Sequence, residues 1–301
     1  MANSLGGLNS TLIAQRGLEI LVNKLPVIGS IVTDFSDADV HYNQTITTRI
    51  PDVGTAQDFD PDTGFVAANA SGQDVSVTLS KFKHATFGFG NAEMSSTNRN
   101  LIEDYAQSFA VQIGDTVMAD ISALFTSGNY ANATTQALAT ATRKTIIIEA
   151  NKELSKRKVR SDRFAIFNSD LYAAVMGDDS MFDLNYNGGS RNNVEAEPTL
   201  EAHGVKISEY ADLPTTANLI GVVGAKDSIV FASRTPADET LALPGVTAPG
   251  RITKVTDPRT GLSVQVREVI DLKLGKVFVT YALIYGVAKG NAKSLQRIKS
   301  A

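Results

Sequence analysis

A long amphipathic segment between residues 97 and 127 dominates the hydrophobic pattern of the chain. It contains no proline, and its large apolar residues recur at every fourth position, as one face of a helix with 3.6 residues per turn requires. These residues are Leu101, Tyr105, Phe109, Ile113, Val117, Ile121 and Phe125. Ser96 or Thr97 supplies an N-cap, and Gly128 followed by Asn129 supplies the stop. The pattern predicts one helix of roughly 46 Å, long enough to cross a whole domain.

The segment before this helix predicts an arm followed by strands. Residues 12–25 form a short amphipathic helix that ends at Pro26, and its apolar side must be covered by the same subunit or by a neighbour. Strands are expected at 44–50 and, after a gap, from 75 to 89, where Thr, Val, Ile and Phe are frequent. The 51–74 stretch between them has no repeating period. We therefore expect a hairpin with an extended loop, and a loop of this length is uncommon unless it is functional.

Helical and extended patterns alternate after the long helix. The expected order is a helix at 137–156, a strand at 163–168, a helix at 169–176, and strands at 205–210, 217–223 and 228–232. This order is typical of a small α/β domain with a central sheet. Residues 235–250 have a linker composition, and the last fifty residues are β-rich, with strands at 261–269, 276–282 and 283–287 and a basic tail.

Composition narrows the class of protein. The 301 residues are 43% hydrophobic, which is enough for a sizeable core and argues against global disorder. The net charge of −4 gives no global attraction to nucleic acid. No apolar run approaches the 18 residues of a membrane-spanning helix, so we expect no membrane partner. The absence of cysteine excludes disulfides and thiolate metal ligands.

The loop between the two strands is acidic and contains no lysine or arginine. Its candidate contact residues are carboxylates and two aromatic side chains: Asp52, Asp58, Phe59, Asp60, Asp62 and Phe65. A calcium loop is the alternative interpretation, but the cluster lacks the glycine at position 6 and the glutamate at position 12 of the EF-hand pattern. We interpret it as a solvated or partner-facing tip.

Candidate chemistry elsewhere is weak. His41, His84 and His203 have no second ligand type at metal spacing. The glycines at 221 and 224 lack the full phosphate-loop spacing, so they indicate a turn at a strand end. The basic run from 143 to 163 has no interleaved aromatic residue before Phe164, which favours a solvated helix face or an acidic protein partner over nucleic acid. We therefore expect no catalytic residue, no metal and no cofactor.

Four phrases in the first third of the chain resemble the major capsid proteins of tailed double-stranded DNA phages. They read LIAQRGLEILVNKLP (12–26), TDFSDADV (33–40), TTRIPDVGTAQDFDP (47–61) and DVSVTLSKFKHATFGFGNAEMS (74–95). The resemblance spans roughly residues 12–130, with a weaker echo in the C-terminal VTYALIYGVAKGNAKSLQRI. It implies an α+β chain with the Hong Kong 97-type capsid fold, which consists of an N-terminal arm, an extended loop, a peripheral domain with a long spine helix, and an axial domain.

The residue patterns follow that order of parts. The expected division is an arm at 1–43, the extended β-hairpin loop at 44–90, a peripheral domain at 91–133 with the spine helix at 97–127, the α/β axial domain at 134–240 and a β-rich peripheral return at 241–301. The resemblance implies that the loop lies across a neighbouring subunit. We predict that its aspartates face a basic surface there, formed by Lys152, Lys156, Arg157, Lys158, Lys293 and Arg297.

The implied function is a major capsid protein that self-assembles into the pentamers and hexamers of an icosahedral phage head. Some members crosslink a loop lysine to a neighbour's asparagine, but no lysine precedes Lys81 in this hairpin, which favours non-covalent assembly. Because Met1 comes only a few residues before the arm, we expect a separate scaffolding protein. Further expected partners are a portal, a decoration protein and packaged DNA bound without sequence specificity. The location is the virion, after assembly in the host bacterial cytoplasm.

Two other functions are alternatives to a phage capsid protein. Encapsulin compartments use the same fold and enclose a protein cargo instead of a genome. A stand-alone α/β enzyme built on residues 134–240 is a more remote alternative, and it requires a convergent polar pocket that the sequence does not display.

Overall fold

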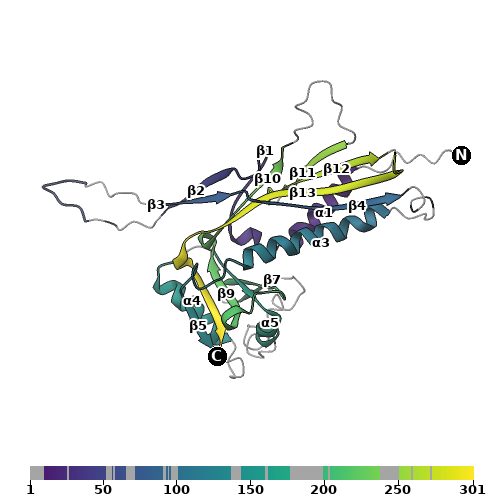
Figure 1. Cartoon of the computed structure of the whole chain (residues 1–301). Helices are drawn as coiled ribbons and strands as arrows, with labels where there is room; N and C mark the ends of the chain where they lie inside the picture. Colours follow the sequence, from purple (N-terminus) through teal and green to yellow (C-terminus); the bar gives the residue numbers. More distant parts are fainter. Residues whose placement is uncertain are drawn as a thin grey trace, which may run out of the picture.

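A computed structural model of the chain shows two β-sheets, an extended hairpin and four α-helices within the residues it describes (Figure 1). Those residues are 10–25, 27–51, 56, 58–65, 72–90, 93, 95, 101–136, 144–159, 162–176, 199–202, 204–237, 251–258, 260–271 and 273–301. The α-helices are α1 (Ser10–Lys24), α3 (Leu101–Ser122), α4 (Lys144–Lys156) and α5 (Ser169–Met176).

The first sheet, which we call the long sheet, is organised around one 14-residue strand. Its strands are β1 (Val32–Val40), β10 (Ile229–Pro236), β13 (Lys276–Lys289), β12 (Ser263–Asp271), β11 (Arg251–Thr256) and β4 (Lys81–Gly90). Along one edge β13 pairs with β12 and then with β10, and along the other it pairs with β4, all antiparallel. β1 joins β10 in parallel. The sequence predicted two strands in place of β13 and none at β1.

The second sheet lies below the long sheet and carries α4 and α5 (Figure 1). Its order is β5 (Ala133–Gln136), β14 (Leu295–Ser300), β9 (Leu219–Ala225), β6 (Arg163–Phe167), β8 (Val205–Glu209) and β7 (Thr199–Ala202). The C-terminal segment that reads as a basic tail is therefore the strand β14, paired on both sides by β5 and β9. β10 lies in the long sheet, although residues 134–240 were expected to form one domain.

Two of the crossings between the two sheets run through short 3-10 turns. η4 (Lys226–Ser228) joins β9 to β10, and η6 (Ala292–Ser294) joins β13 to β14. The Asp227 carboxylate accepts hydrogen bonds from Asn291 and Ser294, and the Tyr130 hydroxyl donates to the Ser228 carbonyl at 2.6 Å. These bonds tie the two crossings to each other. Two further 3-10 turns are η1 (Ile28–Ser30) and η3 (Thr216–Asn218).

Both long helices cover one face of the long sheet. Buried residues of α1 and α3, such as Leu21 and Val117, form one core cluster with Val264, Val279 and Tyr285 of the strands. Gly17 of α1 permits this approach, because a Cβ there would lie 2.9 Å from the ring of Tyr281. The arm helix is therefore covered by its own subunit, which settles the choice that the sequence left open.

The helix α3 ends at Ser122, five residues before the predicted end. The chain tightens there into turns, with the Phe125 amide donating to the Ser122 carbonyl and the Ser122 hydroxyl donating to the Ala119 carbonyl. The Asn129 side chain then satisfies the carbonyl of Leu124. Local side-chain bonds of this kind compete with the helical ladder, which explains the earlier end. The predicted start at residue 97 lies outside the described residues.

Candidate subunit interface

The extended hairpin leaves the body of the subunit through the paired strands β2 (Thr45–Pro51) and β3 (Gly72–Thr78). Their antiparallel register from Thr45–Thr78 to Pro51–Gly72 confirms a hairpin around the acidic loop. The single strand expected at 75–89 is divided, because β4 (Lys81–Gly90) pairs with β13 in the long sheet. At its root, Val77 and Leu79 are fully buried against Val230 and Ile284 of the long sheet. The root is therefore part of the body of the subunit.

Two further contacts fix the direction of the hairpin. Gly286 of β13 lies directly against β3, since a Cβ on it would be 2.3 Å from the Thr78 carbonyl oxygen. Just after β3, Lys81 donates to the Asp120 carboxylate of α3 at 2.6 Å. The other oxygen of Asp120 accepts from the Tyr285 hydroxyl at 2.5 Å. These contacts connect the hairpin root to the long helix and to the central strand.

The tip of the loop is a turn closed by its own hydrogen bonds. The Asp60 carboxylate accepts from the Asp62 amide and from the Thr63 hydroxyl, both at 2.9 Å. The Gly64 amide donates to the Asp60 carbonyl at 2.7 Å, and Gly64 takes a left-handed φ of 71°. The amide of Asp62 and the hydroxyl of Thr63 also lower the pKa of the Asp60 carboxyl below its ordinary value. The tip thus has a defined shape although it is exposed.

Two phenylalanines stand on this turn. Phe59 and Phe65 are 57% and 92% exposed, and their ring centroids lie 4.8 Å apart. Asp58 and Asp62 flank them and are also exposed. An exposed apolar pair on a defined turn is typical of a binding element, because it gains burial only against another surface. We call these residues, 58–65, the loop tip; Asp52, also predicted to take part, lies outside the described residues.

The predicted basic partner residues cluster at the end of α4 but differ in their surroundings. Lys152, Lys156 and Lys158 are exposed there, and Lys293 is exposed on η6. Lys156 already pairs with Glu153 at 2.7 Å. Lys158 takes a positive φ and, with Val159, ends α4 through hydrogen bonds to the carbonyls of Ser155 and Leu154.

Both predicted arginines hold the second sheet together. Arg157 is half-buried, donates to the Lys293 carbonyl at 2.8 Å and to the Gln296 side chain, and its burial lowers the pKa of its guanidinium. Arg297 is 3% exposed, and its Nε donates to the Tyr130 carbonyl at 2.7 Å. Arg297 therefore does not lie on the surface of the folded subunit.

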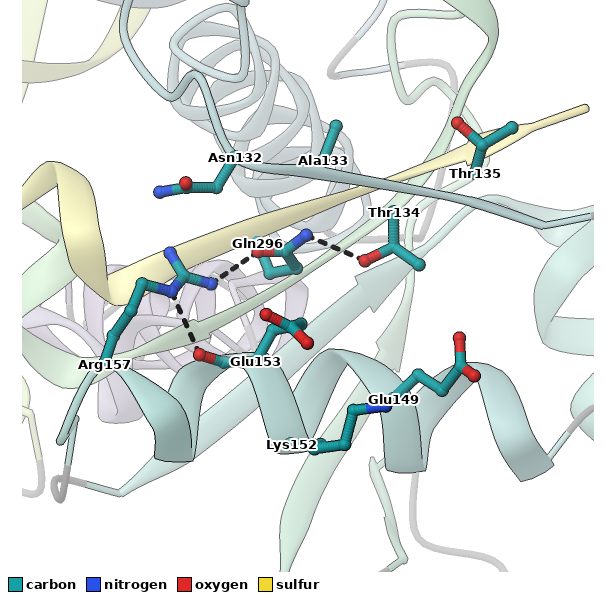
Figure 2. A pocket seen from close by; sticks show the side chains of 9 residues that line it. All are labelled: Asn132, Ala133, Thr134, Thr135, Glu149, Lys152, Glu153, Arg157 and Gln296. Carbon is teal, nitrogen blue, oxygen red and sulfur yellow. Dashed lines mark hydrogen bonds between the residues drawn. The ribbon is translucent and has the colours of Figure 1, made fainter.

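A polar cleft of about 440 Å³ lies between α4 and β5 (Figure 2). Its lining residues are Asn132, Ala133, Thr134, Thr135, Glu149, Lys152, Glu153, Arg157 and Gln296. Figure 2 shows Arg157 and Gln296 bonded to each other across it, with Gln296 also donating to Thr134 at 2.8 Å. The side chains of Arg157, Gln296 and Thr134 therefore connect the end of α4 to the strands β14 and β5. The cleft carries no nucleophile–base pair.

Gly221 and Gly224, which the sequence analysis compared with a phosphate loop, have a packing role. A Cβ on Gly221 would lie 2.7 Å from Phe167, and one on Gly224 would lie 3.0 Å from Phe164. The two glycines of β9 therefore make room for aromatic rings of the neighbouring strand β6. Within the described residues there is no group of three or more His, Asp or Glu able to hold a metal ion, and no helix long and apolar enough to cross a membrane.

The sequence reasoning missed one surface, which the strand register defines. We call it the open face: the side of β4, β11, β12 and β13 turned away from α1 and α3. It carries Phe82, His84, Thr86, Ile252, Lys254, Arg267, Val269, Lys276, Phe278 and Thr280. The Thr86–Thr280 hydrogen bond of 2.9 Å and the ring of Phe278 over Gly88 confirm that these positions share a face. The alternating pattern of β4 indicated in the sequence that this strand has two different faces. Which other strands contribute to the open face could not be predicted from the sequence.

Comparison with known proteins identifies the fold. No protein-family model matches the sequence, and no curated protein sequence matches it. Among solved structures, the capsid of the cyanophage P-SCSP1u matches with a TM-score of 0.59 at 9% identity, over 90% of this chain and 86% of that one. The capsid of an empty GTA particle gives a TM-score of 0.56 at 12% identity, over 92% and 90%. A virus-like particle from Pyrococcus furiosus gives 0.51 at 9%, over 96% and 98%.

These likenesses extend over most of the chain and define the class: an α+β protein with the fold of viral capsid subunits. It is the Hong Kong 97-type capsid fold, and the predicted resemblance is confirmed at the level of the fold.

Proposed function

We propose that this chain is a major capsid protein that self-assembles into pentamers and hexamers of an icosahedral phage head. The observation that carries the proposal is the hairpin: a root buried in the subunit, and a defined tip with two exposed phenylalanines far from it (Figure 1). A subunit that projects an apolar contact element can bury that element against an identical neighbouring subunit. Such head-to-tail contacts close into rings when the rotation between subunits permits.

The other proposed partners follow from this role. A separate scaffolding protein guides assembly in the host bacterial cytoplasm, a portal occupies one vertex, and a decoration protein binds the finished shell. Double-stranded DNA fills the virion without sequence-specific binding, in agreement with the net charge of −4. In this role the chain is a structural protein and not an enzyme.

A compartment that encloses a protein cargo is the second candidate. It is supported by the likeness to the virus-like particle from Pyrococcus furiosus, which covers nearly the whole of both chains. The two candidates differ in content: a capsid packages nucleic acid when portal and packaging enzymes are present, whereas a compartment loads protein. Nuclease-protected DNA in purified particles distinguishes them.

A deletion of residues 54–71 tests the proposal. It leaves a two-residue connection between Pro51 and Gly72, which already pair, and two residues are a common hairpin length. We expect a folded, soluble monomer that forms no shells by negative-stain microscopy, while the intact chain forms rings or shells with its scaffold. Intact shells from the deletion variant would contradict the role of the hairpin, and an intact chain that stays monomeric with its scaffold would contradict the function itself.

A further inference from the structure

We propose that the waist between the two sheets is a rigid joint, and that the buried Tyr130 fixes the angle between the sheets. The waist consists of the three segments through which the chain passes from one sheet to the other: residues 123–132, 226–228 and 290–294. Proteins bend at a few loop or terminal residues that are free to change φ and ψ. The waist lacks that freedom, because its segments are bonded to one another. Its consequence for a shell rests on the proposed function, whereas its rigidity is a property of the single subunit.

Tyr130 lies in the first segment and bonds to the chain on both other crossings. Its side chain has no exposed surface, and its hydroxyl donates a hydrogen bond of 2.6 Å to the Ser228 carbonyl in the second segment. Its own carbonyl accepts a hydrogen bond of 2.7 Å from Nε of Arg297 in β14, the strand that follows the third segment. Burial raises the pKa of the Tyr130 hydroxyl above its ordinary value, so the donor stays protonated. One buried residue thus connects all three crossings.

The second and third segments are also joined directly. The Asp227 carboxylate accepts hydrogen bonds from the Asn291 side chain at 3.2 Å and from the Ser294 hydroxyl at 2.8 Å. The Gly290 amide donates to the Ser228 carbonyl at 2.9 Å. A Cβ on Gly290 would collide with the Asp227 carbonyl oxygen, so the two backbones lie as close as glycine permits. Neither segment can turn alone without breaking these contacts.

One hydrophobic cluster extends across the waist. It contains Phe164, Ile166 and Val222 of the second sheet together with Ile121 of α3 and Phe231 of the long sheet, and each of these side chains is 2% exposed or less. Protein interiors are close-packed, so a rotation of one sheet against the other would open cavities or force overlaps. Packing and hydrogen bonding therefore hold the same angle.

A fixed angle between the sheets has a consequence for a shell. The hairpin root packs on the long sheet, whereas the second sheet lies on the other side of the waist (Figure 1). Neighbouring subunits that contact these two parts are held at the angle that the waist sets. Head-to-tail contacts repeat this angle from one subunit to the next, so it decides how the assembly closes. A rigid waist therefore favours shells of a single diameter.

The distance between two spin labels on the monomer tests the rigidity. The chain has no native cysteine, so labels can be placed on Lys152→Cys in α4 and on Leu274→Cys in the turn between β12 and β13, where both residues are exposed. We expect one narrow distance distribution. Tyr130→Phe keeps the buried ring, removes the hydroxyl, and should broaden this distribution and shift its mean. The control Tyr172→Phe makes the same change on α5, away from the waist, and should leave the distribution unchanged.

A second waist variant guards against a local effect at Tyr130. Asp227→Ala removes the bonds to Asn291 and Ser294 without touching the hydrophobic cluster, and it should also broaden the distribution. Circular dichroism checks that each variant is folded. The rigid waist is disproved by a broad distribution in the labelled chain itself. It is equally disproved if both waist variants give the same distribution as Tyr172→Phe.

Assembly with the scaffold tests the consequence for the shell. Unlabelled Tyr130→Phe and Asp227→Ala should form particles of several diameters by negative-stain microscopy, whereas Tyr172→Phe should form particles of the native diameter. Uniform particles of native diameter from both waist variants would refute the link between the waist and curvature. If the intact chain forms no particles, the proposed function fails, and the label distances in the monomer still decide whether the waist is rigid.

Discussion

The two ends of the β2–β3 hairpin lie in opposite environments. At the root, Val77 and Leu79 have no exposed surface, whereas at the tip Phe65 is 92% exposed. Burying a large aliphatic side chain contributes about 1.5–3 kcal/mol to folding, so the root stabilises the subunit and the tip contributes little. The difference shows how one element can serve two purposes. The subunit folds on the root, and the apolar surface at the tip remains available for association.

The largest effect is expected where β13 meets the hairpin root. An alanine at Gly286 would place its Cβ 2.3 Å from the Thr78 carbonyl oxygen and 2.8 Å from Val77, so backbone would have to move. We expect Gly286→Ala to lower the free energy of unfolding by about 4 kcal/mol or more. Urea denaturation of the monomer measures this, and Gly29→Ala is the matched control, since nothing lies within 4 Å of a Cβ there. Equal midpoints for the two variants would disprove the close contact.

Truncating one side chain at each end of the hairpin sharpens the comparison. Leu79→Ala leaves a cavity in the core and should lower the free energy of unfolding by about 3 kcal/mol. Phe65→Ala removes an exposed ring and should change it by less than about 0.5 kcal/mol. Denaturation curves give the stabilities, and sedimentation of the assembly reaction should show that Phe65→Ala weakens association. A Phe65→Ala variant as unstable as Leu79→Ala would mean that the tip also holds the subunit together.

Strong periodicity made much of the fold predictable from the sequence. The arm helix, the hairpin, the centre of the spine helix and the strands β6 and β8 all have clear apolar patterns. β1 was missed because its sequence, VTDFSDADV, is largely polar, and its parallel pairing with β10 depends on a distant part of the chain. The charges of LQRIKS indicated a solvated tail, but the Tyr130 carbonyl satisfies Arg297 inside the domain, and LQRIKS is strand β14. A burial of that kind depends on tertiary contacts.

The candidate interface was predictable only in part. The loop tip could be found because a long, acidic, non-periodic segment between two strands is unusual. The open face could not, because Arg267, Phe278 and His84 come from three strands and share a face only through the register of the sheet. Short-range charge runs, such as the one at the end of α4, are visible in a sequence, whereas a face assembled across strands is not.

The smallest predicted effect concerns the order of the loop tip in acid. Hydrogen bonds from the Asp62 amide and the Thr63 hydroxyl hold the pKa of Asp60 below its ordinary value of 3.8. The bonds therefore stabilise the turn above pH 3.8, and this contribution is lost as the pH falls through the lowered pKa of the folded turn. An amide NMR titration of the monomer should show the Asp62 and Gly64 signals shifting with a midpoint below pH 3.8. Asp60→Ala should show those signals already displaced at neutral pH, whereas Asp58→Ala should leave them in place. A transition of the Gly64 amide with its midpoint above pH 3.8 would contradict a hydrogen-bonded Asp60, and the tip would then lack the defined shape that these bonds give it.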